Sequence, residues 1–412
     1  MKNLNIVNMN PIARIGKRDC ITLLIVWCLY TPSFSQLEEI MALSTKSNKE
    51  FVSKTGDINY IAPYLLLEKD TLDHPFKKQL QNEYYTTLHL FNKITTSPIP
   101  KKKITDLNVV VKEAKQEILK QTISKKVVMF NEEHHNPYHR VYVETFLKDL
   151  KKQGFTVLAL ETLAWEDQKL NSRKYPISKS GTYTKEPYFA NLVRKALELG
   201  YKVLPYESKE IVDNMSIAIR EKNQADNLVN IITKEPGNIL VLAGYSHIAE
   251  KPIASGHGGA NEWMASILKT KYGIDPLTID QTEMINEENL NAVALPMLDA
   301  TYYIPEEFKG VYDMCLIYPK KVEDLHNELG KKKIDVILNN EYVNTNTLIQ
   351  FYIKQEYEKH KDKAIPYEQF MIESTKMSLY LGPAKKYIML LRDKNYKVIT
   401  KKEVSDFNLI QL

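Results

Sequence analysis

The stretch VVMFNEEHHNPYHR, residues 127–140, decides the fold, because an apolar run of strand-forming residues ends there in a dense group of ionisable side chains. In an open parallel α/β sheet, ligands bind beyond the carboxyl ends of the strands. Four further apolar runs follow the same plan, namely FTVLAL (155–160) before Glu161, YKVLPY (201–206) before Glu207, NILVLAGYS (238–246) before His247, and PLTI (276–279) before Asp280. We therefore expect these ionisable side chains to converge at one edge of a sheet.

Helix start and stop signals separate these runs. Residues 139–152 end at Gly154, residues 187–199 start with proline and stop at Gly200, and residues 216–234 stop before Pro236. Strands that alternate with helices are typical of βαβ units. We predict an α/β domain over 121–330, with a mainly parallel sheet and helices on both faces.

The regions on either side of this domain have different secondary-structure patterns. Residues 36–120 are expected to form a helical segment, since apolar residues recur at helical spacing over 76–91 and 107–119. Four strand-like runs near the carboxyl terminus, at 348–353, 376–380, 387–392 and 396–400, predict a small antiparallel domain, sandwich-like, over 335–412.

The amino terminus resembles a secretory signal peptide. Basic residues from Arg14 to Arg18 precede an apolar run at 21–30, and small residues lead to an expected cleavage after Ser35. An apolar run of about ten residues falls short of the roughly 20 that cross a bilayer. We expect residues 1–35 to be removed, no integral membrane span in the mature chain, and a secreted, periplasmic destination.

Charge and cysteine content narrow the function classes. The net charge of +5 falls to +2 once residues 1–35, which carry four basic groups and one acid, are removed (+5 − 3 = +2). A nearly neutral chain gives no reason to expect nucleic acid as a partner, so a small-molecule or peptide substrate is expected. Cys315 is the one cysteine outside 1–35, which excludes an internal disulfide and a Cys-based metal cluster in the mature chain.

The candidate site residues come from the strand ends and from one helix. They are Glu132, His134, His135, Glu161, Glu207, Arg220 and His247. Arg220, Gln224 and Asn227 share one helix face, where the arginine could hold a developing oxyanion or form a structural salt bridge. The polar loop 164–186 could be a lid over the site or plain surface decoration. Ser246 beside His247 lacks the glycine-flanked elbow of a nucleophilic serine.

At these residues the chain resembles the superfamily that contains erythromycin esterases, ChaN-like haem-binding lipoproteins and Tiki-type proteases. The residues Asn131-Glu132-Glu133-His134 are similar to its Gly-Glu-x-His motif, with Asn131 in place of glycine, and the erythromycin-esterase spacing would select His135 instead. Three further segments are similar to family motifs: LALET (158–162) with Glu161, the helix segment that begins at Arg220, and LVLAGYSHI (240–248) with His247. The resemblance covers about 125–320 and implies the α/β fold.

The resemblance leaves three chemical readings open. In the preferred one, the chain is a hydrolase of the erythromycin-esterase type without a cofactor. His134 or His135 activates water, Glu132 and Glu161 orient the imidazole, and Arg220 and His247 stabilise the oxyanion. Glu207 would hold substrate or Arg220.

The second reading is a ChaN-like protein that holds haem or iron with His or Tyr side chains as axial ligands, motivated by the HNPYH cluster at 135–139. The third is a Tiki-like protease with a divalent metal on Glu132, His134 and His247. A catalytically silent scaffold is the remaining alternative.

Overall fold

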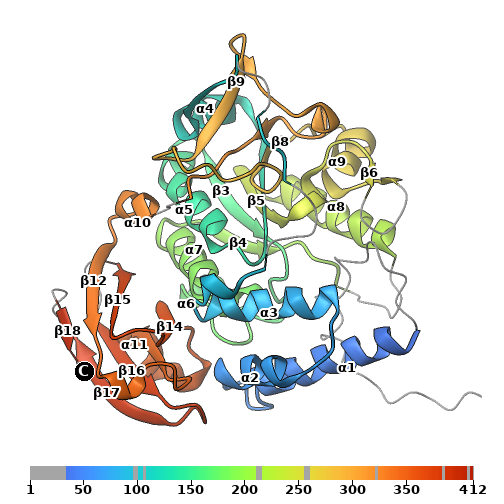
Figure 1. The fold of residues 1–412 in the computed structure, drawn as a ribbon. Coiled ribbons are helices and arrows are strands. Elements are labelled where there is room, and N and C mark those ends of the chain that lie inside the picture. Colours follow the sequence, from blue (N-terminus) through green and yellow to red (C-terminus); the bar gives the residue numbers. More distant parts are fainter. Residues whose placement is uncertain are drawn as a thin grey trace, which may run out of the picture.

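The computed structural model describes residues 34–95, 101–104, 108–209, 216–254, 260–320, 323–382, 386–405 and 409–411. Its centre is a six-stranded parallel sheet in the order β11-β8-β2-β5-β3-β4 (Figure 1). The strands are β2 (Val127–Glu132), β3 (Phe155–Leu160), β4 (Lys202–Pro205), β5 (Asn238–Gly244), β8 (Leu277–Asp280) and β11 (Met314–Cys315). The predicted fold class is confirmed.

The strands are apolar throughout because both faces of the sheet are covered. Val128 and Phe130 face a core shared with α4 (Ala114–Gln121), α5 (Pro137–Lys152) and α7 (Pro187–Glu198). Val127 and Met129 face the opposite core, shared with α8 (Ile217–Lys234) and α9 (Met264–Tyr272). Because helices cover both faces of the sheet, every residue of β2 is buried, including Glu132 at its carboxyl end.

The order of the strands brings two distant segments together. β5 inserts between β2 and β3 and pairs with β2 in parallel from Val127↔Ile239 to Glu132↔Gly244. The chain then crosses to β8 on the far side of β2. Such a switch point is where open α/β sheets bind ligands, and it lies between the ends of β2 and β5.

The amino-terminal segment is helical as predicted, with one correction. Helices α1 (Phe34–Phe51), α2 (Ile61–Lys69) and α3 (Pro75–Thr87) share one core, which also includes Ala190 of α7 and Leu348, Ile365 and Met371 from the carboxyl-terminal region. The predicted helix at 107–119 is wrong in its first part, because β1 (Val110–Glu113) forms a strand before α4 begins. Consecutive valines favour a strand, and β1 pairs antiparallel with β9 (Ala294–Leu298).

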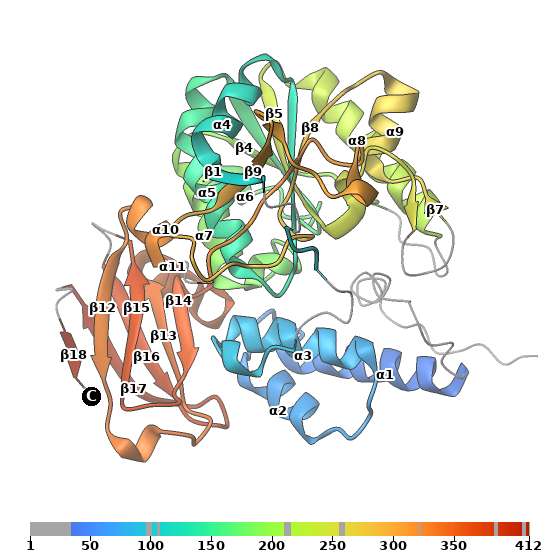
Figure 2. The same ribbon diagram turned by 45° about the horizontal axis from the view of Figure 1, so that its top comes forward.

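The carboxyl-terminal region packs two sheets face to face (Figure 2). One sheet contains β14 (Glu368–Met371), β13 (Leu348–Ile353), β16 (Tyr387–Arg392) and β17 (Val398–Val404). The other contains β15 (Lys376–Leu381), β12 (Lys332–Ile337) and β18 (Leu409–Gln411). Ile334 and Leu379 of one sheet meet Phe351 and Met389 of the other in a single core, which makes the region sandwich-like.

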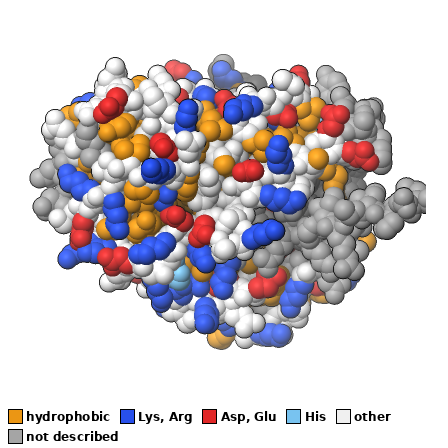
Figure 3. Space-filling model, turned by 90° about the horizontal axis from the view of Figure 1, so that it is seen from below, with side chains coloured by type: hydrophobic (Ala, Val, Ile, Leu, Met, Phe, Trp, Pro, Cys, Tyr) orange, Lys and Arg blue, Asp and Glu red, His pale blue; other side chains and the backbone are white. Residues whose placement is uncertain are grey.

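The surface and the amino terminus add little about function. On the face that Figure 3 shows, acidic and basic side chains lie interspersed with apolar ones. No helix in the described part of the chain has the length and hydropathy of a membrane span. The expected signal peptide and its apolar run lie outside the described residues except for the start of α1 at Phe34.

Candidate functional site

His134 lies at the end of β2, held from one side by a carboxylate. Its Nδ1 lies 3.2 Å from Oε1 of Glu132. Arg140 donates two hydrogen bonds to the same carboxylate, from Nε to Oε2 over 2.6 Å and from Nη2 to Oε1 over 2.8 Å. Burial raises the pKa of Glu132, but Arg140 and His134 outweigh it and leave the pKa below its usual value. Glu132 is therefore an acceptor, and His134 donates through Nδ1.

The helix start explains how Arg140 reaches this position. The Asn136 side chain accepts the backbone N–H of Tyr138, and Pro137 occupies the first turn of α5. The helix thus begins two residues before the predicted start at His139, and Arg140 turns back to the strand end. Its Nη1 also donates to Glu186, 2.8 Å away, at the start of α7.

The other ring nitrogen of His134 is unengaged. Nε2 is buried and has no hydrogen-bond partner among the described residues. The ring stacks on Tyr183, with 4.3 Å between ring centroids, and meets Tyr245 edge-on at 5.2 Å. A buried polar atom without a partner is rare and marks a place where a ligand or water can bind.

Gly244 joins this histidine to a second cluster. A Cβ at Gly244 would lie 2.5 Å from Cε1 of His134, so the ring rests directly on the glycine backbone. The N–H of Gly244 donates to Oε2 of Glu161 over 2.6 Å. Glu161 and His134 therefore contact the same residue, but Glu161 makes no hydrogen bond to the His134 ring and does not orient it as predicted.

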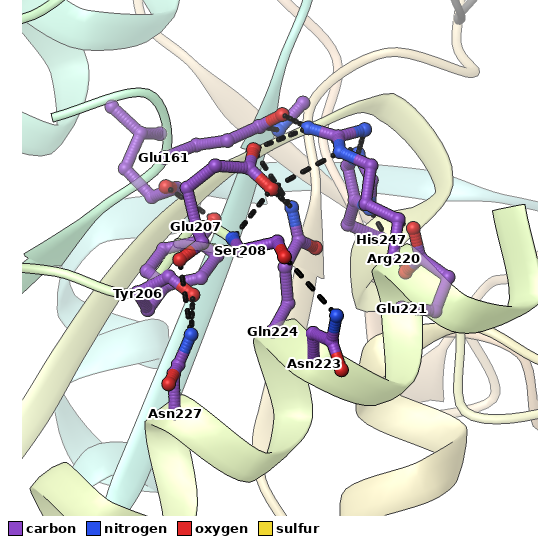
Figure 4. Close-up of polar contacts among 12 residues, drawn as sticks. Glu161, Tyr206, Glu207, Ser208, Arg220, Glu221, Asn223, Gln224, Asn227 and His247 are labelled. Atoms are coloured by element: carbon purple, nitrogen blue, oxygen red, sulfur yellow. Dashed lines mark hydrogen bonds and ion pairs between the residues drawn. The ribbon is translucent and has the colours of Figure 1, made fainter. Parts of the chain in front are cut away.

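Arg220 is the centre of the second cluster (Figure 4). Its Nη2 lies 2.6 Å from Glu161 and 2.6 Å from Glu207, and its Nε lies 3.2 Å from Glu207. Gln224 donates to both carboxylate oxygens of Glu207, and Asn227 donates to the Glu207 carbonyl. The predicted shared face of α8 is present, and all three of its side chains converge on Glu207.

His247 completes this cluster from a 3-10 turn, η5 (Tyr245–Ile248), rather than from the predicted strand. Its Nδ1 lies 2.8 Å from Glu221, and its Nε2 lies 3.5 Å from Glu161 and 3.3 Å from Nη1 of Arg220. Burial lowers the pKa of His247, but Glu221 and Glu161 outweigh it and raise the pKa to about 10. His247 is therefore an imidazolium at neutral pH.

The backbone is strained where the two clusters meet. Thr162, directly after Glu161, has a φ of 56°, and Tyr245, directly after Gly244, has a φ of 40°. Residues with a side chain rarely adopt such angles, and strain of this kind concentrates at functional sites. Both positions lie at the carboxyl ends of neighbouring strands.

Six of the seven predicted residues thus form one connected group, and His135 stands apart. The His135 ring is partly exposed, while its backbone carbonyl accepts a hydrogen bond from Thr86 of α3 over 2.6 Å. Asp280, the fifth strand-end residue, binds the Asn131 amide at 2.7 Å and lies in a buried polar network beside β2. The ring of His134, unlike that of His135, contacts Glu132 and Gly244, so we take His134 as the candidate for the motif histidine.

The loop 164–186 covers the site and is anchored at several points. Tyr183 lies on His134, and Gly181 approaches the carbonyl of Thr162 so closely that a Cβ would be 2.6 Å from that oxygen. Asp167 and Arg173 form a buried ion pair inside the loop. Neither Tyr183 nor Glu83 of α3, which acts electrostatically on this cluster, was among the predicted site residues.

The side chains that the haem and metal readings would use are in part already engaged. Both ring nitrogens of His139 have partners, Nδ1 the Glu133 N–H and Nε2 the Asn136 amide, so within the HNPYH cluster a haem would have to be held by His135 or Tyr138. Both oxygens of Glu132 are bound by Arg140. No group of three His, Cys, Asp or Glu side chains suited to a cation occurs among the residues that the structure describes.

Comparisons with known proteins give only distant fold similarities. No family model matches the sequence. No curated protein matches it either. Among solved structures, ChaN of Campylobacter jejuni, described with cofacial haem, shares 11% identity over 53% of this chain and 99% of its own, with a TM-score of 0.33.

Toxin folds give similar values. The type III effector HopBA1 shares 12% identity over 50% of this chain and 92% of its own, with a TM-score of 0.31. The Pasteurella multocida toxin carboxyl-terminal region, described with a thiol-protease-like triad, shares 12% identity over 71% of this chain and 41% of its own, with a TM-score of 0.32. Similarities this distant carry no argument about chemistry, so the site is interpreted from its own geometry.

Proposed function

We propose that the chain is a hydrolase in which His134 activates water to cleave an ester or a related carbonyl bond. The observation that carries the proposal is the buried, unpartnered Nε2 of His134 on a ring whose Nδ1 is fixed by Glu132. A carboxylate that accepts from one ring nitrogen leaves the other as a proton acceptor. Arg140 keeps Glu132 ionised, so the carboxylate also stabilises the imidazolium that forms.

The second cluster supplies positive charge. His247 is an imidazolium whose Nε2 has only long contacts, 3.5 Å to Glu161 and 3.3 Å to Arg220. In the proposed mechanism it turns its Nε2–H to the oxygen of the attacked carbonyl, where negative charge develops. The short ion pairs of Arg220 to Glu161 and Glu207 assign it a positioning role, which holds Glu161 against His247.

The test is turnover on a panel of esters, lactones and peptides. We expect His134→Gln to lower kcat about 100-fold or more on any substrate that the wild type cleaves, because general-base catalysis is worth about 10²–10⁴-fold. The matched control is His135→Gln, which we expect to stay within about threefold of the wild type, because the His135 ring is partly exposed and, in the part of the chain that the structure describes, forms no hydrogen bond or ring contact with Glu132, His134 or Arg140. Full activity of the His134 variant contradicts the mechanism, and an inactive wild type contradicts the function.

A further inference from the structure

We propose that Glu83, in the amino-terminal helical segment, is a further catalytic residue of this site and protonates the leaving group opposite His134. The proposal rests on the proposed function and adds the general acid that the strand ends do not supply. Glu83 lies outside the region that the sequence motifs cover. The segment α1–α3 thereby becomes part of the active site.

The position of α3 brings Glu83 to the sheet edge. α3 lies between the α/β domain and helices α1 and α2 in both views (Figures 1 and 2). Thr86 donates to the carbonyl of His135 over 2.6 Å and ties the helix to the turn after β2. Gln79, Glu83 and Thr86 are spaced at i, i+4 and i+7, so they share the helix face that meets this turn.

Unpaired atoms mark the place where a substrate would bind. Oε1 of Glu83, Nε2 of His134 and Oγ1 of Thr162 are all buried without a hydrogen-bond partner among the described residues. Native proteins leave few buried polar atoms unpaired. Three such atoms, a carboxyl oxygen on α3, an imidazole nitrogen after β2 and a hydroxyl after β3, indicate a site that a polar ligand completes.

The charges around Glu83 suit an acid. Burial raises the pKa of Glu83 to about 7, against the opposing fields of His134 and Arg140, while Glu132 adds to the rise. The phenol groups of Tyr84, Tyr183 and Tyr245 also interact electrostatically with this carboxyl. A carboxyl that is half protonated near neutral pH can donate a proton that an ordinary glutamate has already lost.

The proposed step balances in atoms and charge. His134 Nε2 takes a proton from water, and the hydroxide oxygen bonds to the carbonyl carbon. The bond from that carbon to the leaving oxygen then breaks with its electron pair, and the Glu83 proton passes to this oxygen. The alcohol and the acid leave, and the proton on His134 returns through solvent to the Glu83 carboxylate.

The test varies the leaving group. Alkoxides need a proton to leave, whereas p-nitrophenolate does not, so we measure ethyl butyrate and p-nitrophenyl butyrate. For Glu83→Gln we expect kcat to fall about 100-fold or more on the ethyl ester and to stay within about threefold on the nitrophenyl ester. His134→Gln should lose activity on both esters. Glu50 is an exposed residue on α1, so Glu50→Gln should keep activity on both. Equal loss or no loss on the two esters for Glu83→Gln overturns the acid role.

A second measurement is independent of activity. An ionised carboxyl at this buried position costs stability, so the Tm of Glu83→Gln relative to the wild type should rise from pH 5 to pH 8, and that of Glu50→Gln should not. A pH-independent difference for Glu83→Gln overturns the buried placement. A wild type that is inactive on the whole panel of esters, lactones and peptides contradicts the proposed function, whereas a pH-independent Tm difference for Glu83→Gln overturns the role of Glu83 whatever the activity of the wild type.

Discussion

At the scale of single residues, the two site histidines differ because their carboxylate partners differ. His134 forms a hydrogen bond to one carboxylate, that of Glu132, which is already paired with Arg140. His247 lies between Glu221 and Glu161, which outweigh the cost of burial and keep it charged. In the proposed mechanism His134 is therefore the proton acceptor and His247 the charged hydrogen-bond donor, and acid-base catalysis needs both roles.

The charge on His247 predicts a pH-dependent stability. Its folded pKa of about 10 lies above the ordinary value of 6.5. The stabilisation is therefore complete below about pH 6.5 and is lost as the pH rises towards 10, at up to about 1.4 kcal/mol per pH unit. Urea unfolding of the wild type and of His247→Gln at pH 6, 8 and 10 measures this.

We expect the wild type to lose its stability advantage over His247→Gln across this range. His135→Gln is the control, since its ring is partly exposed and its difference from the wild type should not follow the same course. A constant difference between the wild type and His247→Gln would show that His247 is neutral when folded.

At the scale of elements, the close packing of β5 against the turn after β2 gives the next prediction. Gly244 has an extended backbone with a φ of −83°, so alanine can adopt its conformation. The cost of Gly244→Ala therefore arises from the new Cβ, which would press on His134. We expect a loss of about 1–3 kcal/mol in the free energy of unfolding and a fall of at least about tenfold in kcat, because a displaced base transfers protons poorly.

The control is Gly273→Asn at the end of α9. No atom lies within 4 Å of a Cβ there, and asparagine tolerates the φ of 65°. Urea unfolding and ester turnover measure both variants. Wild-type kcat in Gly244→Ala would mean that the His134 ring can move without consequence.

The elements that the sequence predicts well are those whose pattern is local. β3 and β16 match the predicted residues to the last position, because each is an apolar run with clear breaks at both ends. The convergence of Glu132, Glu161 and His247 was predictable because the carboxyl ends of parallel strands meet at one edge. β1 was missed because its valines also fit a helical spacing, and its pairing with β9 joins residues far apart in the sequence.

The site residues that were missed come from elements without a strand-end signal. Glu83 belongs to an amphipathic helix whose docking on the sheet edge depends on long-range packing, which no local pattern reveals. Tyr183 begins a short 3-10 turn, η4 (Tyr183–Lys185), within the loop 164–186. Arg140 had a usable signal, since Asn136-Pro137 is a typical helix start, and a helix that begins there turns Arg140 back to Glu132.

At the scale of the whole molecule, buried contacts fasten the carboxyl-terminal domain to the α/β domain. Arg194 of α7 donates to Glu356 of α11 (Lys354–His360) over 2.6 Å and to the carbonyl of Ile365 over 2.7 Å. Asn191 donates to the carbonyl of Tyr367 over 2.8 Å. All five of these residues are buried. The domains are therefore expected to stabilise one another.

Glu356→Ala tests this coupling, because it leaves a buried arginine without its carboxylate. We expect the free energy of unfolding to fall by about 3–5 kcal/mol. The fluorescence of Trp165 and Trp263 should show this loss, because both residues report on the α/β domain although the substitution is in the carboxyl-terminal domain. Glu358→Ala, at an exposed ion pair with Lys354, should change the free energy of unfolding by less than about 1 kcal/mol. An unchanged fluorescence transition in Glu356→Ala would show that the domains unfold independently.

The central claim, that Glu132 fixes His134 with a bare Nε2 at the sheet edge, is tested most directly by the tautomer of the His134 ring. Long-range proton–nitrogen NMR of the ¹⁵N-labelled protein, at a pH where the ring is neutral, reports which nitrogen carries the proton. We predict the proton on Nδ1 in the wild type and a redistribution in Glu132→Gln. A proton on Nε2 in the wild type would leave His134 without an acceptor for water and would contradict the account.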